Sequence, residues 1–315
     1  MALSLVTGGG GFIGSNLVEA ILGKRGDVRV LDNFSTGRRE NLRDAASWAE
    51  AGGGTFELLE GDIRDRDTCH RAVRGVDYVL HQAAIPSVQR SVGSPMETHE
   101  VNLTGTLNLL VAARDAGVSR FIYASSSSLY GESEILPKVE SMAPAPVSPY
   151  GLQKLAGETY CRLFHQLYGF ETLALRYFNI FGPRQDPNSD YSAVVPRFVS
   201  ALRDGRPPTI YGDGEQTRDF TYISNAVQAN LLACEADADA VGQAYNVACG
   251  ERISLNELAR ILGGLAGTSI KPEYGAARPG DIRHSLAGID RARERLGYHP
   301  DLQAHEGLRR TWQEL

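Results

Sequence analysis

The sequence predicts an α/β fold, in which a doubly wound parallel sheet is followed by a smaller α/β domain. Three observations support this prediction. Short apolar runs alternate with helix-like segments over the first 180 residues, as they do in doubly wound sheets. The runs are nearly continuous in their apolar residues, which is typical of parallel strands buried on both faces. After residue 181 the composition changes, because stretches 182–192 and 203–219 are rich in Gly, Pro and Asp.

Each element of the sheet follows from its residues. The predicted strands are the apolar runs SLVTG, VRVLDN, TFELLEGD, VDYVLHQAA, RFIYASSS and FETLALRYFNIFG. The helix-like segments between them cover residues 12–23, 65–74, 97–116 and 149–168. Beyond them we expect a helix at 224–236, a strand at 243–249 and a helix at 254–265. The first domain is therefore predicted to span residues 1–180, with a return segment near 217–250, and the second, interleaved with it, to span 181–315.

The composition excludes several classes of protein. The chain has 315 residues and a net charge of −6, and no run of Lys and Arg forms a basic strip, so nucleic acid is not an expected partner. The four cysteines are widely spaced and form no Cys/His ligand cluster, so we predict neither a metal site nor a disulfide framework. We expect no signal peptide, no membrane partner and no membrane-spanning segment, and hence a cytoplasmic protein.

A glycine-rich turn follows the first predicted strand, in VTGGGGFIGSNL. Gly8, Gly11 and Gly14 let the backbone approach a pyrophosphate, and the next helix offers free N–H groups and the positive end of its dipole. Asp32 ends the second strand, eighteen residues beyond Gly14, where a carboxylate accepts hydrogen bonds from an adenosine ribose and repels a 2′-phosphate. The pattern predicts NAD rather than NADP as the cofactor. The alternative is a tight strand–helix turn without a ligand.

Two later strand ends extend this predicted cofactor site. Asp62, in GDIRD at the end of the third strand, is placed to contact an adenine edge. Capping of the following helix by Asp62 or Asp65 is the alternative. The HQAA run from His81 to Ala84 ends the fourth strand with small residues that leave room for a cofactor. His81 is explained equally well as a hydrogen-bonded histidine of the sheet.

The pair Tyr150 and Lys154 lies in SPYGLQKLAGE, and its four-residue spacing places both side chains on one face of a helix. Alone this spacing is a weak signal, and a surface coincidence is the alternative. However, RFIYASSSSLYG places serines 125–128 at the end of the fifth strand, and parallel strands direct their C-terminal ends to one crevice. A phenol with a pKa of about 10 is a poor base, but a nearby ammonium and a positive nicotinamide ring favour the phenolate. Tyr150 then accepts a proton from a substrate hydroxyl as hydride leaves, while a serine stabilises oxyanion charge and Lys154 also contacts the nicotinamide ribose.

Seven motifs together resemble one known family. TGGGGFIG, HQAA, SSSSLYG, SPYGLQK, LRYFNIFGPRQDP, DGEQTRDFTYI and RPGDIRHSLA occur in this order over nearly the whole chain. The chain resembles the extended short-chain dehydrogenases/reductases, in the group of nucleotide-sugar epimerases and dehydratases. The resemblance implies a Rossmann-type NAD-binding domain and a smaller UDP-sugar-binding domain. The expected cofactor contacts are Gly8, Gly11, Phe12, Ile13, Asp32, Asn33, Asp62, Ile63, Gln82, Ala83, Ala84, Asn102, Ser125, Tyr150, Lys154 and Tyr177.

The resemblance also implies a reaction. The catalytic residues it indicates are Ser126, Tyr150 and Lys154, with Ser127 as the alternative hydroxyl. Dehydratases of this group carry an Asp–Glu pair after the matching hydroxyl, and decarboxylases a Glu, whereas Ser127 and Ser128 stand here. Without that acid, oxidation and re-reduction at the sugar C4 is expected, which favours a 4-epimerase over a dehydratase. The C4 hydride would pass to tightly bound NAD, the 4-keto sugar would rotate, and the hydride would return to the opposite face.

The same resemblance implies a UDP-hexose as the substrate. Ser285, four residues beyond the Asp of RPGD, matches the small gate of epimerases that accept N-acetylated sugars, so UDP-N-acetylglucosamine is expected. UDP-glucose/UDP-galactose and the UDP-N-acetylhexosaminuronic acids are the alternatives, and Arg90 either faces a C6 carboxylate or lies in a solvated loop. Pro86 replaces a common Gly, and Ser224 replaces a common Asp but can still cap its helix. The expected substrate contacts are Ser87, Ser126, Asn179, Gln185, Ala193, Val195, Tyr211, Arg218, Arg278, Asp281 and Ser285.

Two further expectations concern assembly and activity. The helices at 97–116 and 149–168 match those that pair into a four-helix dimer interface in the family, so we expect a homodimer. A catalytically silent NAD-sensing regulator on the same fold is the alternative to an enzyme. The presence of both Tyr150 and Lys154 disfavours that alternative.

Overall fold

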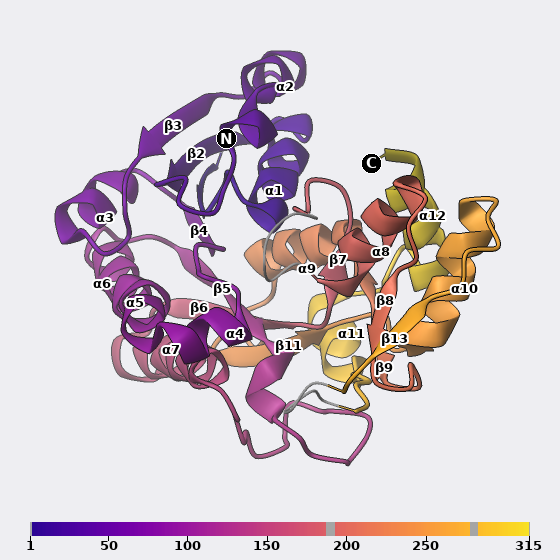
Figure 1. Cartoon of the computed structure of the whole chain (residues 1–315). Coiled ribbons are helices and arrows are strands. Elements are labelled where there is room, and N and C mark those ends of the chain that lie inside the picture. Colours follow the sequence, from indigo (N-terminus) through magenta and orange to yellow (C-terminus); the bar gives the residue numbers. More distant parts are fainter. Residues whose placement is uncertain (1, 187–192, 278–282, 315) are drawn as a thin grey trace.

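The computed structural model describes residues 2–186, 193–277 and 283–314. Within these ranges the chain forms a parallel sheet with the strand order β11-β6-β5-β4-β1-β2-β3 (Figure 1). Each neighbouring pair in this sheet is parallel. The doubly wound fold predicted from the sequence is thereby confirmed. The strands of the sheet are β1 Leu3–Thr7, β2 Asp27–Asp32, β3 Phe56–Glu60, β4 Tyr78–His81, β5 Arg120–Ser126, β6 Glu171–Tyr177 and β11 Gln243–Val247.

Helices cover both faces of the sheet, which explains the continuous apolar runs of its inner strands. On one face Val6 packs in a cluster with residues of α1, α2 and α9 (Ile223–Glu235), and on the other Leu5 packs with residues of α3, α6 and α7. The chain order reverses between β1 and β4, and the crevice of a doubly wound sheet opens at such a point. The helices before β6 are α1 Phe12–Gly23, η1 Arg39–Leu42, α2 Ala45–Gly52, α3 Arg66–Ala72, α4 Val88–Gly93, α5 Pro95–His99, η2 Glu100–Gly105, α6 Thr106–Asp115, η3 Ser127–Tyr130 and α7 Pro149–Tyr168.

Two predicted elements are interrupted. The helix predicted at 97–116 contains the π-helical turn η2 between α5 and α6. There Thr106 Oγ1 donates a hydrogen bond to the carbonyl oxygen of Asn102 at 2.7 Å. In a regular α-helix this carbonyl oxygen would instead accept from the main-chain N–H of residue 106. The strand predicted at 170–182 divides into β6 and β7 Ile180–Phe181, because Asn179 adopts a positive φ of 36°.

The C-terminal elements are shorter and form three two-stranded sheets within the described residues. Figure 1 shows α10, α12 and β13 gathered on one side of the molecule, opposite α3 and α6. The helix α9 begins at Ile223 with Tyr222 as its N-cap, so the expectation that Ser224 caps it is wrong. These elements are α8 Val194–Arg203, β8 Thr209–Tyr211, β9 Thr217–Arg218, β10 Thr221–Tyr222, α9 Ile223–Glu235, β12 Ile253–Ser254, α10 Leu255–Leu265, β13 Glu273–Gly275, α11 Asp290–Leu296 and α12 Ala304–Glu314.

The chain crosses back to the large sheet within the predicted return segment. Strand β11 pairs in parallel with β6 at the edge of that sheet, and α9 packs on the face that α1 also covers. The division of the chain into two domains near residue 180 stays a prediction. None of the described helices is long and apolar enough to cross a membrane.

Candidate active site

The glycine-rich turn after β1 leaves no space for side chains. Gly8 has a φ of 69°, and a Cβ built there would lie 2.8 Å from the main chain of Ala83. A Cβ at Gly14 would lie 2.1 Å from the carbonyl oxygen of Gly8. Helix α1 begins at Phe12 with Gly11 as its N-cap, and no side chain of the described residues caps it. Its first N–H groups, including that of Ile13, are thus available to a phosphate, and this cradle fits the pyrophosphate of a dinucleotide.

Carboxylates at the ends of β2 and β3 complete this region. Asp32 accepts hydrogen bonds from the main-chain N–H of Gly10 at 2.8 Å and of Phe34 at 2.7 Å, and its burial raises its pKa. Asn33 donates to Asp62 at 2.8 Å. The pKa of Asp62 is lowered to about 2, first of all by its hydrogen bond from the Arg64 side chain.

Two alternatives from the sequence concerned helix capping by Asp62 or Asp65 and a structural role for His81. The contacts of these residues now allow a comparison. Asp65 caps α3 by accepting from the N–H of Asp67 at 3.1 Å, so capping does not require Asp62. His81 lies between Thr7 Oγ1 at 2.7 Å and Thr106 Oγ1 at 2.9 Å. Burial lowers the pKa of His81 to about 3. We therefore interpret it as a neutral, hydrogen-bonded histidine of the sheet.

Further predicted cofactor residues lie in hydrogen-bond networks beside the crevice. Tyr177 OH accepts from Asn230 at 2.7 Å and donates to Gln82 Oε1 at 3.3 Å. Asn102 is buried and binds the N–H and carbonyl groups of Ile85, at 2.7 and 3.2 Å. The side-chain amides of Gln82 and Asn102 thus fix the loop after β4, where Ala83 and Ala84 lie half-buried. Ile63 packs against Gly105.

The structure brings together Tyr150, Lys154 and the end of β5. The Tyr150 side chain lies beside Ser126, whose hydroxyl acts to lower the pKa of the phenol. Lys154 Nζ donates to the carbonyl of Ala124 at 2.7 Å and lies 5.9 Å from the centroid of the Tyr150 ring. Ser126 Oγ also accepts from the N–H and hydroxyl groups of Ser128, at 3.2 and 2.9 Å. The tyrosine, the lysine and one serine therefore form a compact constellation.

The electrostatics of this constellation depend on burial. The expectation that Lys154 and a bound nicotinamide ring together favour the phenolate stays a prediction. Among the protein's own groups, burial raises the pKa of Tyr150, and the Ser126 side chain opposes this only in part. Burial also lowers the pKa of Lys154 to about 7. The reason is that both groups lie in a space that solvates charge poorly, so each is shifted towards its neutral form.

The substrate side of the site is assembled around the segment 217–221. Asn179 Nδ2 donates to the carbonyl of Asp219 at 3.3 Å, and the N–H of Thr221 donates to Asn179 O at 3.2 Å. The N–H of Ser285 donates to the carbonyl of Thr217 at 3.1 Å, so the predicted gate lies beside the strand of Arg218. Arg278 and Asp281 lie outside the described residues.

The remaining predicted substrate residues lie at the starts and ends of neighbouring elements. Ser87 is the N-cap of α4, where its hydroxyl accepts from the N–H of Arg90 at 3.0 Å. Gln185 Nε2 donates to the carbonyl of Ile180 at 3.3 Å. Ala193 is the exposed N-cap of α8, Val195 is buried in its first turn, and Tyr211 ends β8.

Three residues at the site were not identified from the sequence. Ser91 accepts a hydrogen bond from the N–H of Tyr150 at 3.0 Å and so fixes the start of α7. Asp219 is buried and accepts from three main-chain N–H groups, two of them at Cys249 and Ala287. Glu158 contacts Ser125 at 2.8 Å. The sequence carried a signal only for Glu158, which continues the four-residue spacing of Tyr150 and Lys154.

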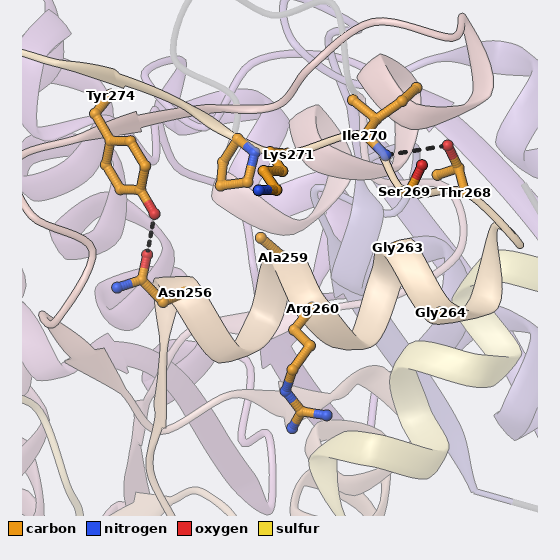
Figure 2. Close-up of a pocket in the computed structure, with 11 residues that line it drawn as sticks. Asn256, Ala259, Arg260, Gly263, Gly264, Thr268, Ser269, Ile270, Lys271 and Tyr274 are labelled. Carbon is orange, nitrogen blue, oxygen red and sulfur yellow. Dashed lines mark hydrogen bonds between the residues drawn. The ribbon is translucent and has the colours of Figure 1, made fainter.

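A separate cavity of about 290 Å³ lies between α10 and the segment 268–274 (Figure 2). Tyr274 OH donates to Asn256 at 2.9 Å across one end of it. Within the described part of the chain, none of the predicted site residues lines this cavity. We assign no role in the reaction to it.

Comparisons with known proteins identify the class to which this fold and site belong. The family model described as "NAD dependent epimerase/dehydratase family" matches residues 4–248. The chain belongs to this family, as its motifs indicated, and NAD is its cofactor.

Individual relatives cover nearly the whole chain. A UDP-glucose 4-epimerase of Mycolicibacterium smegmatis is 39% identical over 310 residues, which are 98% of this chain and 96% of the relative. The structure of a UDP-N-acetylglucosamine 4-epimerase from Methanobrevibacter ruminantium, in complex with UDP-N-acetylmuramic acid, matches with a TM-score of 0.93 and 40% identity, over 99% of this chain and 97% of that chain. The structure of a Bacillus cereus UDP-glucuronic acid 4-epimerase, in complex with UDP-glucuronic acid and NAD, matches with a TM-score of 0.89 and 31% identity. The match covers 99% of this chain and 98% of that chain.

Proposed function

We propose that the chain is an NAD-dependent UDP-sugar 4-epimerase that prefers UDP-N-acetylglucosamine and UDP-N-acetylgalactosamine. The observation that carries the proposal is the gathering of Tyr150, Lys154 and Ser126 at the end of β5. The acid positions of dehydratases hold Ser127 and Ser128, and Ser128 donates its hydroxyl to Ser126. Among the described carboxylates near this strand end, Glu158 is bound by Arg176 at 2.6 Å and is not free to protonate a leaving group.

The residues of the site divide the proton transfer between them. When bound, NAD accepts a hydride from the sugar C4 and returns it. In this proposal Tyr150 removes the proton of the 4-hydroxyl group and later gives it back. Ser126 is the second hydroxyl of the pair, in preference to Ser127, because Ser126 is the serine whose side chain lowers the pKa of Tyr150. The amino group of Lys154 is oriented by the Ala124 carbonyl and supplies positive charge to the site when it is protonated.

The preference for N-acetylated sugars rests on the space around Ser285. This side chain is small and only 9% exposed, and its main chain is bonded to the strand that bears the expected phosphate ligand Arg218. Relatives named for plain, N-acetylated and uronic-acid sugars are all similar to the chain. Arg90 forms an ion pair with Glu97 at 2.6 Å, which neutralises the residue that a C6 carboxylate would need and disfavours the uronic acids.

Proton NMR of the purified protein tests the proposal. The protein is incubated without added NAD, in separate samples, with UDP-N-acetylglucosamine, UDP-glucose and UDP-glucuronic acid. We expect UDP-N-acetylgalactosamine to form faster than UDP-galactose or UDP-galacturonic acid. Faster conversion of UDP-glucose would refute the sugar preference but keep the 4-epimerase. Conversion of none of the three would refute the 4-epimerase itself.

We also propose that two chains associate through the helices expected at 97–116 and 149–168, together with the adjoining helices α4 and α5. Large apolar side chains are exposed on these helices, including Val92 at 65%, Met96 at 71% and Leu167 at 68%. Light scattering at micromolar concentration should give the mass of a dimer, and Met96→Glu should shift it to a monomer. Ile135→Glu is the control, because Ile135 is 69% exposed but lies in a loop outside these helices. A monomeric wild type would refute the proposal.

A cytoplasmic location is the last part of the proposal. All four cysteines are free and buried, as expected in a reducing compartment. Fractionation of cells that express the tagged chain tests this location, and recovery outside the cytoplasmic fraction would refute it.

A further inference from the structure

Helix α7 carries a third polar side chain on the face of Tyr150 and Lys154. Glu158 lies one turn beyond Lys154 and accepts a hydrogen bond from Ser125 Oγ at 2.8 Å. Lys154 donates a hydrogen bond to the carbonyl of residue 124, and Tyr150 lies beside residue 126. Three successive turns of the helix therefore contact three successive residues at the end of β5.

Arg176 extends this contact to the neighbouring strand and to the serine turn. It lies directly beside Ser125 in the register of β5 and β6. Its guanidinium binds both carboxylate oxygens of Glu158, at 2.6 and 3.0 Å, and the two side chains are only 5% and 12% exposed. A third nitrogen donates to Tyr130 OH at 2.7 Å. Tyr130 ends the turn that begins after Ser126, so one ion pair joins the helix of Tyr150 to the turn that follows Ser126.

The energetics of this pair favour a role in geometry over one in stability. A buried ion pair gains little net free energy of folding, because desolvation offsets most of the attraction. It does impose direction, since a guanidinium and a carboxylate bond best in one planar arrangement. The opposite charges also leave no net charge beside Lys154, whose own pKa is already lowered by burial.

We propose that Glu158 and Arg176 are positioning residues that set the distance between Tyr150 and Ser126. Neither residue is expected to touch the substrate or NAD. They act through Ser125, Tyr130 and the backbone of α7. The inference rests on the proposed function, because it takes Tyr150 and Ser126 as the proton-transferring pair.

The chain contains a matched control for this pair. Arg120 binds Glu171 at 2.6 Å, with side chains 10% and 37% exposed, and the two residues are paired in register at the start of the same two strands. Glu158→Gln and Glu171→Gln therefore remove the same charge from ion pairs that lie at opposite ends of β5 and β6. A cavity of about 370 Å³ is lined by Glu158 and Arg176, so water can reach the guanidinium left by the first substitution and the variant is expected to fold.

The experiment compares steady-state kinetics of these two variants, well below the melting temperature of each. For Glu158→Gln we expect kcat to fall about 10- to 100-fold, because small misplacements of reacting groups have effects of this size. The KM for the UDP-sugar should change less than about 3-fold. The amount of NAD bound per chain should also change less than about 3-fold. For Glu171→Gln we expect kcat within about 2-fold of the wild type, with a lowered melting temperature.

A milder pair of variants guards against a loss of folding. Tyr130→Phe removes only the hydroxyl that accepts from Arg176 and donates to Asn246 Oδ1, each at 2.7 Å, and kcat should fall by about 3- to 10-fold. Tyr245→Phe is its control, because this buried hydroxyl donates to the carbonyl of Ala240 at 2.6 Å, away from the site. Equal kcat values for Tyr130→Phe and Tyr245→Phe would overturn the proposal, as would a wild-type kcat for Glu158→Gln.

A crystal structure separates this inference from the proposed function. If the wild type epimerises no UDP-sugar, the proposed function fails, and the distance between Tyr150 OH and Ser126 Oγ then decides the inference. We expect this distance to be longer in Glu158→Gln than in the wild type and to be unchanged in Glu171→Gln. A wild-type distance in Glu158→Gln would overturn the positioning role.

Discussion

Lys154 donates a hydrogen bond at 2.7 Å to the main-chain carbonyl of Ala124, in a space where its side chain is only 4% exposed. An amino group in such a position is solvated by few partners when charged, and its pKa is lowered to about 7. In the unfolded chain the same group has a pKa of about 10.4. Lys154 therefore couples the stability of the fold to pH.

The sign of this coupling gives the first prediction. Between pH 7 and pH 10 the unfolded chain binds the Lys154 proton and the folded chain does not, so the contribution of Lys154 to stability rises with pH. This contribution is lost progressively as pH falls from about 10 to about 7. Lys154→Met should remove a slope of up to about 1.4 kcal/mol per pH unit from the free energy of unfolding, as measured by urea denaturation at pH 7, 8 and 9. Lys271→Met, at an exposed lysine, should keep the wild-type slope, and a wild-type slope in Lys154→Met would contradict the prediction.

Removal of the phenol tests the assigned base. Tyr150→Phe should lower kcat by about 10² to 10⁴-fold, because it removes the proton-transferring group and retains the ring. The amount of NAD bound per chain should be unchanged. Tyr168→Phe is the control, since Tyr168 ends the same helix with a side chain 54% exposed. A Tyr150→Phe enzyme with more than about a tenth of wild-type kcat would remove Tyr150 from its role.

Two glycines of α1 should respond in opposite ways to alanine. Gly14→Ala places a Cβ 2.1 Å from the carbonyl of Gly8, so the turn must move, at a cost of about 1–3 kcal/mol, and NAD should be released. Gly23→Ala meets no described atom within 4 Å and should stabilise the protein by up to about 1 kcal/mol. Thermal unfolding and the NAD content per chain measure both effects. Retention of NAD by Gly14→Ala would show that the turn does not bind the pyrophosphate.

A larger residue at the proposed gate should change the sugar preference. Ser285→Tyr should lower kcat/KM for UDP-N-acetylglucosamine by about 100-fold and that for UDP-glucose by far less, because the ring fills the space of the acetyl group. Ser269→Tyr makes the same change at an exposed position of the cavity in Figure 2 and should alter neither value. A parallel loss on both sugars in Ser285→Tyr would mean that this residue does not discriminate between them.

The parts of the structure that were predicted correctly depend on local patterns. Continuous apolar runs identified the strands, and the spacing of Tyr150 and Lys154 placed both residues on one helical face. The same reasoning missed the ion pair of Glu158 and Arg176, because it joins a helix to a strand and depends on their relative positions. It also did not include the effect of burial, which raises the pKa of Tyr150, because desolvation depends on how much protein surrounds a group and not on which residues are near it in sequence.

The position of β11 has a consequence for synthesis of the chain. This strand forms one edge of the large sheet by pairing with β6, yet it ends only at Val247 of 315 residues. Until more than three quarters of the chain has left the ribosome, β6 presents an unpaired edge and the face covered by α9 is open. Such an edge can pair with other nascent chains. The emerging protein thus has an interval of vulnerability to aggregation that ends when residues 223–247 dock.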